Sequence, residues 1–87
     1  MKKTKPLLSS REIFGLNVRK ARRLKEISQE ELAFRADISR TYLSEVERGE
    51  RNISVNNMEA LAIALDLTLP DLLNPTLFSV AANIALD

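Results

Sequence analysis

The chain has 87 residues, enough for one small domain, and its hydrophobic content of 45% is ordinary for a globular protein. It contains no cysteine and no histidine, which excludes disulfides, Ser-His-Asp catalysis and most transition-metal sites. Nothing else pairs a nucleophile with a base, so we expect no enzyme, no metal and no cofactor. No apolar run approaches the roughly 20 residues of a membrane helix, and the start MKKTKPLLSS lacks an apolar signal-peptide core, so we expect a cytoplasmic protein.

The net charge of +1 hides an uneven distribution of charge along the chain. Residues 1–27 hold nine Lys or Arg and two acids, a balance of +7; residues 28–52 hold four basic and six acidic residues, a balance of −2. Residues 53–87 hold four acids and no basic residue, a balance of −4. The first third is therefore suited to a polyanion such as nucleic acid, and the last third is not.

Residues 10–25 are predicted to form the first helix, after a flexible basic arm at residues 1–8. Ser9 and Glu12 have the spacing of a capping box at its start. Apolar residues then recur at helical spacing and form its inward face: Phe14, Val18, Ala21 and Leu24. Basic residues occupy the rest of its surface, where a solvated face and DNA contact are both open: Arg19, Lys20, Arg22 and Arg23.

Three further helices are predicted at residues 29–36, 40–48 and 55–65. Each follows a serine that can cap it: Ser28, Ser39 and Ser54. Gly49 is a typical C′ residue for the second of them. The inward face of the third is apolar: Val55, Met58, Leu61, Ala62 and Leu65.

A short fifth helix begins at Thr68 and Pro70, because proline fits the first turn, and Pro75 interrupts it. Residues 77–86 can form a last short helix. No segment alternates with a period of two, so we predict an all-α fold. The chain is divided into three parts: an arm at 1–8, a helical domain at 9–74 and a tail at 75–87.

Residues 29–48 have the pattern of two short helices that cross closely at a steep angle. Ala33 is the small residue needed where they touch, and Ile38, Leu43 and Val46 fill the wedge against the first helix. This is the internal geometry of a helix-turn-helix. With Leu43 and Val46 inward, the second helix turns a polar face outward, with Tyr42 at its margin: Arg40, Thr41, Ser44, Glu45 and Arg48.

This polar face has the chemistry of a DNA reader. Arginine donates two hydrogen bonds to guanine, and serine and threonine bond to bases or phosphates. The helix start also favours a phosphate, and Arg51 and Asn52 follow Gly49 on a loop suited to backbone contacts. The amide of Gln29, at the front of the preceding helix, is expected to be free and aimed the same way. The candidate DNA-binding residues are Gln29, Ser39, Arg40, Thr41, Tyr42, Ser44, Arg48, Arg51 and Asn52.

Residues 15–73 resemble the lambdoid-repressor/Cro type of helix-turn-helix domain, the XRE-like regulators. Within that superfamily, the run RTYLSEVERGERNIS is similar to controller proteins of restriction-modification systems. The resemblance implies a five-helix lambda-repressor-like domain, a symmetric dimer and an operator upstream of the gene's own promoter. It implies base or backbone contacts for Arg40, Thr41 and Tyr42, and phosphate contacts for Gln29, Arg51 and Asn52.

The resemblance leaves several points open. Asp37 and Asp66 stand where such domains commonly have glycine in a turn, and aspartate tolerates a left-handed backbone better than most residues. Glu30 and Glu31 either complement the helix dipole or form an acidic patch that touches RNA polymerase. Glu45 either accepts a hydrogen bond from cytosine or pairs with a neighbour on its helix, Arg48.

The predicted function is a sequence-specific, dimeric DNA-binding regulator acting on a pseudo-palindromic operator. The alternative is an antidote of the toxin-antitoxin type, whose tail grips a partner protein. The acid-rich end carries more apolar surface than a four-helix core covers, which predicts a homodimer interface at Leu69, Leu72, Leu73, Leu77 and Phe78. The tail can instead fold back on its own core.

Overall fold

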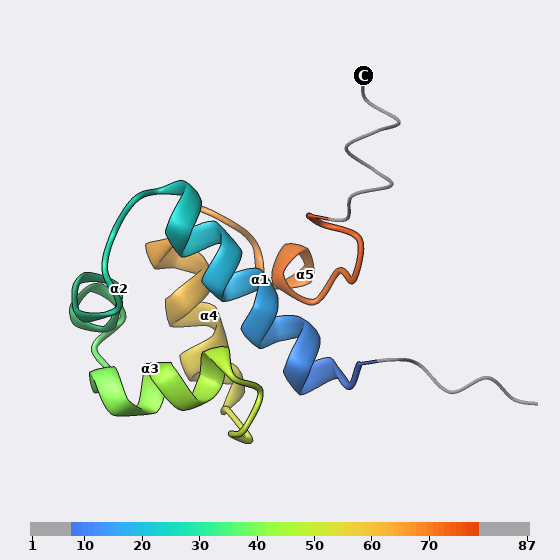
Figure 1. Ribbon diagram of the computed structural model, residues 1–87, viewed down its shortest axis with the longest axis horizontal. Coiled ribbons are helices and arrows are strands. Elements are labelled where there is room, and N and C mark those ends of the chain that lie inside the picture. Colours follow the sequence, from blue (N-terminus) through green and yellow to red (C-terminus); the bar gives the residue numbers. More distant parts are fainter. Residues whose placement is uncertain (1–7, 79–87) are drawn as a thin grey trace, which may run out of the picture.

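The computed structural model describes residues 8–78, which form five helices and no strand (Figure 1). The helices are α1 (Ser10–Leu24), α2 (Gln29–Ala36), α3 (Arg40–Glu47), α4 (Val55–Ala64) and α5 (Leu69–Leu72). The all-α, five-helix prediction is confirmed. None of these helices is long and apolar enough to cross a membrane. The predicted arm at 1–8 and last helix at 77–86 lie almost wholly outside the described residues.

All five helices begin where the sequence predicts, because each start is set by a local side-chain cap. The hydroxyl of the N-cap residue accepts a hydrogen bond from the backbone amide three residues on, in each case: Ser9, Ser28, Ser39, Ser54 and Thr68. Such a cap stabilises a helix by about 1 kcal/mol. The predicted ends of α1, α3 and α4 ran one residue too long, since the residue there is the C-cap itself.

The first four helices end in the same way. The residue after the left-handed position donates its amide to a carbonyl five residues back, which is the Schellman arrangement. These amides belong to Ile27, Ile38, Glu50 and Leu67. The left-handed positions are Gly49, as predicted, the two aspartates Asp37 and Asp66, each with φ of 60°, and Glu26, which the sequence did not indicate. Three of the four amide donors are apolar and pack against the core.

The five helices enclose one apolar core, with α1 packed against α3 and α5, and α4 packed against α2 and α5. Its large, fully buried side chains are Phe14, Val18, Leu32, Leu43, Val46, Leu61 and Leu72. The prediction that Leu24 is a core residue is wrong, since its side chain is 72% exposed. At about 100° per residue, Leu24 lies roughly 90° around α1 from the centre of the stripe. Val55, at the first position of α4, is also exposed.

Two contacts fix the position of α1 against α3 and α5. Gly15 lies so close to α3 that an added Cβ would fall 2.2 Å from the carbonyl oxygen of Val46. The buried amide of Asn17 donates to the carbonyls of Leu72 and Asn74, at 3.0 and 2.9 Å. These bonds satisfy carbonyls at the end of α5 and hold that short helix on α1.

Candidate nucleic-acid interface

The outer face of α3 is the first element of the candidate site. Figure 1 shows α3 along the lower edge of the molecule, below α4 and α1. Leu43 and Val46 point into the core and are buried, as predicted. The predicted outward residues are exposed or half-buried: Arg40, Thr41 and Arg48 are exposed, and Ser44 and Glu45 are half-buried. The buried pair therefore turns the polar face of α3 to solvent.

The inner face of α3 carries a buried carboxylate, Glu47, which the sequence analysis did not single out. It is 3% exposed. Its two oxygens accept hydrogen bonds from Arg22, at 2.7 Å to Nε and 3.1 Å to Nη2, and one also accepts from Gln29 Nε2 at 3.0 Å. Arg22 donates as well to the carbonyl of Ile27. One side chain thus joins α3 to α1 and α2.

This network corrects two predictions. Arg22 does not lie on an outer basic face, because its side chain is only 12% exposed and is held by Glu47. The amide of Gln29 is not free for a phosphate, since it donates to the same carboxylate. A signal was present in the sequence: Glu47 follows Leu43 by four residues, on the inward stripe of α3, and a charge there requires a partner.

A second cluster lies where α3 is followed by its loop. Arg51 Nε is 2.9 Å from Glu45 Oε1, and the Arg51 guanidinium stacks over the Tyr42 ring, 4.9 Å from its centroid. The Tyr42 hydroxyl accepts a hydrogen bond from Asn57 Nδ2 at 3.3 Å. Glu45 therefore pairs with Arg51 and not with Arg48, the neighbour that one of the two open alternatives gave it.

Arg48 has different partners. Its Nη1 donates to Ser44 Oγ at 2.6 Å, and its Nε is 3.1 Å from Glu50 Oε1. Within residues 8–78, Arg40 is the arginine of α3 and its loop that forms no ion pair with a carboxylate. Its guanidinium is therefore not held by a carboxylate of the described residues, unlike those of Arg48 and Arg51.

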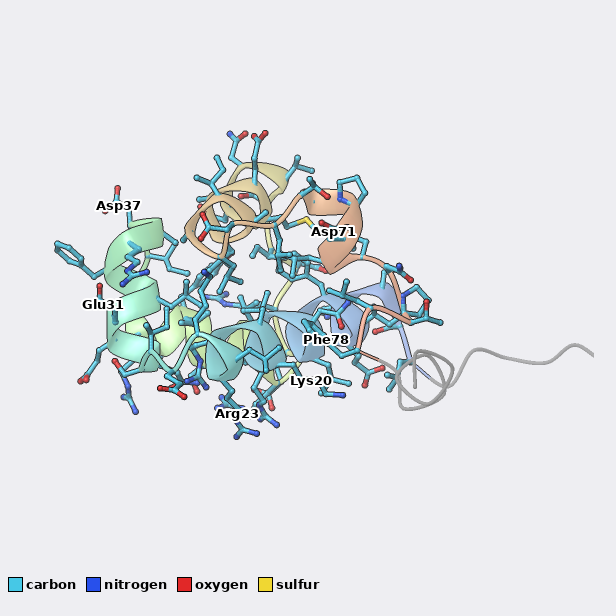
Figure 2. All side chains as sticks on the ribbon, turned by 90° about the horizontal axis from the view of Figure 1, so that it is seen from above. Lys20, Arg23, Glu31, Asp37, Asp71 and Phe78 are labelled. Carbon is cyan, nitrogen blue, oxygen red and sulfur yellow. The ribbon has the colours of Figure 1, made fainter. Side chains whose placement is uncertain are left out.

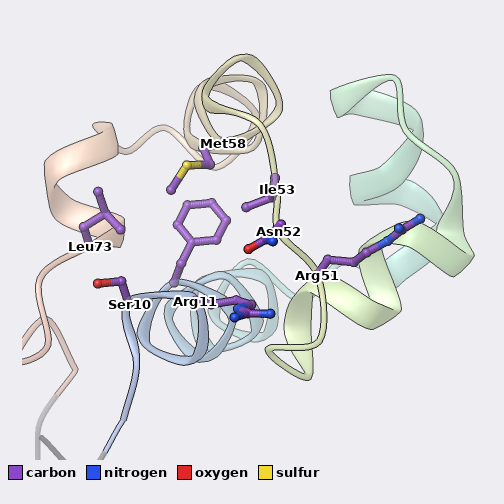
Figure 3. Close-up of a pocket in the computed structure, with 8 residues that line it drawn as sticks. Ser10, Arg11, Arg51, Asn52, Ile53, Met58 and Leu73 are labelled. Atoms are coloured by element: carbon purple, nitrogen blue, oxygen red, sulfur yellow. The ribbon is translucent and has the colours of Figure 1, made fainter.

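Two further candidates, Ser39 and Asn52, lie in different surroundings. Ser39 is a structural cap, because its hydroxyl accepts from the amide of Tyr42 at 3.0 Å. Asn52 is exposed and lines a hollow of about 160 Å³ around Phe14, between α1 and α4. In Figure 3, Arg51 extends away from the other labelled residues of this hollow, toward α3.

Two basic residues of α1, Lys20 and Arg23, line a hollow to which α3 contributes no residue. Figure 2 shows Lys20 and Arg23 pointing the same way, with Phe78 beside Lys20. Together with Leu24 they line a hollow of about 480 Å³. Of the predicted acidic patch, Glu31 pairs with Arg35 at 2.8 Å. Within the described residues no cluster of three metal-ligating side chains occurs.

The predicted dimer residues do not form one surface. Leu72 is fully buried in the chain's own core, so its assignment to an exposed interface is wrong. Leu73 lines the hollow around Phe14, whereas Phe78 lines the hollow beside Lys20 and is half-buried against the core. Leu69 and Leu77 are also half-buried. At Phe78 the chain folds back, and the large apolar side chains that remain most exposed are Leu24, Phe34, Val55 and Ile63.

Comparison with known proteins identifies the class. The sequence profile of the helix-turn-helix family matches residues 18–72, which span the second half of α1 and all of α2, α3, α4 and α5. The chain belongs to this family of DNA-binding transcription regulators.

Its relatives include restriction-modification controllers. Control protein C.BamHI of Bacillus amyloliquefaciens is 48% identical over 67 residues, which cover 76% of this chain and 83% of that protein. The controller protein C.AhdI from Aeromonas hydrophila has a TM-score of 0.71 at 42% identity, covering 75% of this chain and 98% of that one. A hypothetical transcription factor, NHTF from Neisseria, has a TM-score of 0.75 at 34% identity, and the match covers 99% of this chain and 98% of that one.

Proposed function

We propose that this protein is a sequence-specific transcription regulator of the restriction-modification controller type, which binds the promoter of its own gene. The observation that carries the proposal is the outer face of α3, where Arg40 and Thr41 are exposed and Arg40 has no carboxylate partner among residues 8–78. The other side of this helix is held to α1 and α2 through Glu47. The similarity to C.BamHI and C.AhdI supports the controller type. Binding to promoter DNA would place the protein in the cytoplasm, with the nucleoid.

The residues take different roles in this proposal. Arg40 donates to a guanine edge in the major groove, and Thr41 contacts a neighbouring base or phosphate. Tyr42, which is half-buried, lies at the margin of the reading surface. Arg51 and Asn52 contact the backbone, which positions the helix without reading sequence. Ser44 and Arg48, hydrogen-bonded to each other, complete the exposed surface.

Binding is proposed to be dimeric. A recognition helix of eight residues covers too few base pairs for specificity, so two copies should lie about 34 Å apart on a pseudo-palindromic operator. If a dimer engages roughly six to ten phosphates, its affinity should fall by about three to five decades between roughly 50 and 200 mM salt.

The roles of the two arginines are tested with the DNA directly upstream of the gene and a scrambled duplex of the same composition. Arg40→Ala should lose about 1–3 kcal/mol of binding free energy on the upstream DNA, with no matching loss on the scrambled duplex. Arg51→Ala should weaken binding to both duplexes equally. It should also reduce the slope of log K against log salt by about 1, because one phosphate contact is lost. Footprinting of the wild type should show two protected half-sites. Equal binding of wild type to both duplexes, with no footprint, would refute sequence-specific regulation at this promoter.

The dimer surface is proposed to include Ile63, near the end of α4, since its side chain is 70% exposed. Ile63→Asp should then give a folded monomer in sedimentation, with weaker binding to the upstream DNA. Phe34→Asp is the matched control, because Phe34 is 82% exposed on a different helix. An Ile63→Asp protein that stays dimeric, or a control that also dissociates, would contradict this surface.

Two earlier expectations remain predictions. Contact with RNA polymerase through Glu30 and Glu31 is untested by the geometry. The alternative of a toxin-antitoxin antidote depends on the tail, and residues 79–87 lie outside the described part of the chain.

A further inference from the structure

Arginines on the recognition surface differ in what holds them. Arg40 stands without a carboxylate partner among residues 8–78, whereas Arg51 is held by Glu45 and Arg48 by Glu50. A protein selected only for strong attraction to phosphate would leave all three cations unpaired. Two carboxylates, Glu45 and Glu50, therefore hold arginines of the proposed recognition surface, and the fold alone does not require this.

Glu45 does not serve the core. Its side chain is 33% exposed, and the described contact of its carboxylate is with Arg51, on the loop after α3. Tyr42 also holds this pair in place, because the Arg51 guanidinium lies over the Tyr42 ring. The Tyr42 hydroxyl in turn accepts a hydrogen bond from Asn57. Arg51 is therefore held in one place by a charge and a ring, with half of its side chain still open to solvent.

An exposed ion pair of this kind is weak, because water and salt screen both charges. A DNA phosphate is an equally good acceptor for a guanidinium and lies in a dense line of negative charge. Arg51 can therefore exchange Glu45 for a phosphate, but only by giving up the energy of the existing pair. Each phosphate contact that is opposed in this way contributes less to binding.

We propose that Glu45 restrains Arg51, and that DNA binding transfers Arg51 from the Glu45 carboxylate to a backbone phosphate. The restraint lowers the sequence-independent part of the affinity, so that binding depends more on Arg40 and the other base contacts. This inference rests on the proposed DNA-binding function and assigns to Glu45 the control of non-specific attraction. In this proposal Glu45 acts on Arg51 and is assigned no base contact.

The test measures binding to a random-sequence duplex of about 30 base pairs over a range of salt concentrations. Glu45→Gln should bind this duplex about two- to fivefold more tightly than the wild type, the range expected for releasing an exposed ion pair. The slope of log K against log salt should stay close to that of the wild type, because Arg51 contacts the same phosphate in both complexes. Glu59→Gln is the matched control, because Glu59 is exposed on α4 and forms no ion pair among the described residues. Its affinity for the duplex should equal that of the wild type.

A second background separates the restraint from simple repulsion between Glu45 and DNA. With Arg51→Ala already present, Glu45→Gln should give no gain, because no arginine remains to be released. An equal gain in both backgrounds would overturn the proposal, and so would the absence of any gain in affinity for Glu45→Gln alone. Loss of binding by Glu45→Gln to the upstream DNA, without a gain on the random duplex, would assign Glu45 to base reading and also overturn it.

Failure of the proposed function would look different. The wild type itself would then bind the upstream DNA and the random duplex equally, or bind neither. Circular dichroism of each variant checks that the helices are intact. Intact helices are expected, because the Glu45 side chain is 33% exposed and Glu59 is an exposed residue.

Discussion

Glu45 and Glu47 are two residues apart on α3, and each is bonded to an arginine, yet they do opposite things. The Glu47 side chain is 1% exposed and is held by Arg22 from α1 and by Gln29 from α2. The Glu45 side chain is 33% exposed and is held by Arg51 from the adjacent loop. The pairing is the same, and burial decides whether it builds the recognition helix into the fold or leaves a contact that DNA can replace.

The physical reason is desolvation. A buried carboxylate has lost its water, so removal of its partner leaves an uncompensated charge in a medium of low dielectric constant. An exposed carboxylate recovers water when its partner leaves, and the net loss is about 0–1 kcal/mol. The inner pair should therefore control the stability of the fold, and the outer pair should control binding alone.

The largest expected effect is on the inner pair. Arg22→Ala removes two hydrogen bonds from Glu47 and leaves its charge buried, which should lower the free energy of unfolding by about 3–5 kcal/mol. Arg35→Ala is the control, because it removes the exposed pair with Glu31 on α2 and should cost about 0.5 kcal/mol or less. Urea denaturation measures both. Similar losses for the two variants would remove the distinction between buried and exposed pairs.

A middle-sized effect concerns Gln29, which the sequence assigned to DNA and the structure assigns to Glu47. Gln29→Ala should lower the free energy of unfolding by about 1–2 kcal/mol, because it removes a hydrogen bond to a partly buried charge. Its affinity for a random duplex should match the wild type. A variant with unchanged stability and weaker binding to the random duplex would return Gln29 to the phosphate contacts.

The features that the sequence predicted are local ones. Helix starts followed from a hydroxyl three residues before an amide, and the turns at Asp37 and Asp66 followed from a residue type that tolerates positive φ. The outward face of α3 followed from Leu43 and Val46, which lie within one turn of each other. Each of these inferences needs only neighbours along the chain.

The features that the sequence missed are contacts between distant segments. Arg22 and Glu47 are 25 residues apart, and Asn17 lies 55 residues from the carbonyl that it binds at the end of α5. A helical pattern classes such residues as polar and therefore exposed, as it did for Arg22. The burial of Leu72 was missed for the same reason, because the position of α5 depends on Asn17 in α1.

The smallest expected effect is on an exposed pair far from DNA, between Lys25 after α1 and Asp66 after α4. Lys25 Nζ is 2.8 Å from Asp66 Oδ2. The hydrogen bond from Lys25, with the lysine charge, lowers the pKa of Asp66 from its ordinary value of 3.8. A group with a lowered pKa in the folded state stabilises the fold above its unfolded pKa, and this contribution disappears as the pH falls through the folded value.

Asp66→Asn tests this pair without disturbing the turn, because asparagine also accepts the left-handed backbone that Asp66 adopts at φ of 60°. The Tm of the wild type should exceed that of the variant slightly between about pH 5 and 7, and the two values should converge as the pH falls below 3.8. Asp37→Asn, at another left-handed position with φ of 60°, corrects at pH 7 for the change of residue itself. Added salt at about 1 M should remove the difference at every pH, because the carboxylate is fully exposed to solvent. If the difference in Tm survived both acid and salt, the pair of Lys25 and Asp66 would behave like the buried Glu47 contact. Solvent exposure would then not distinguish the two kinds of ion pair.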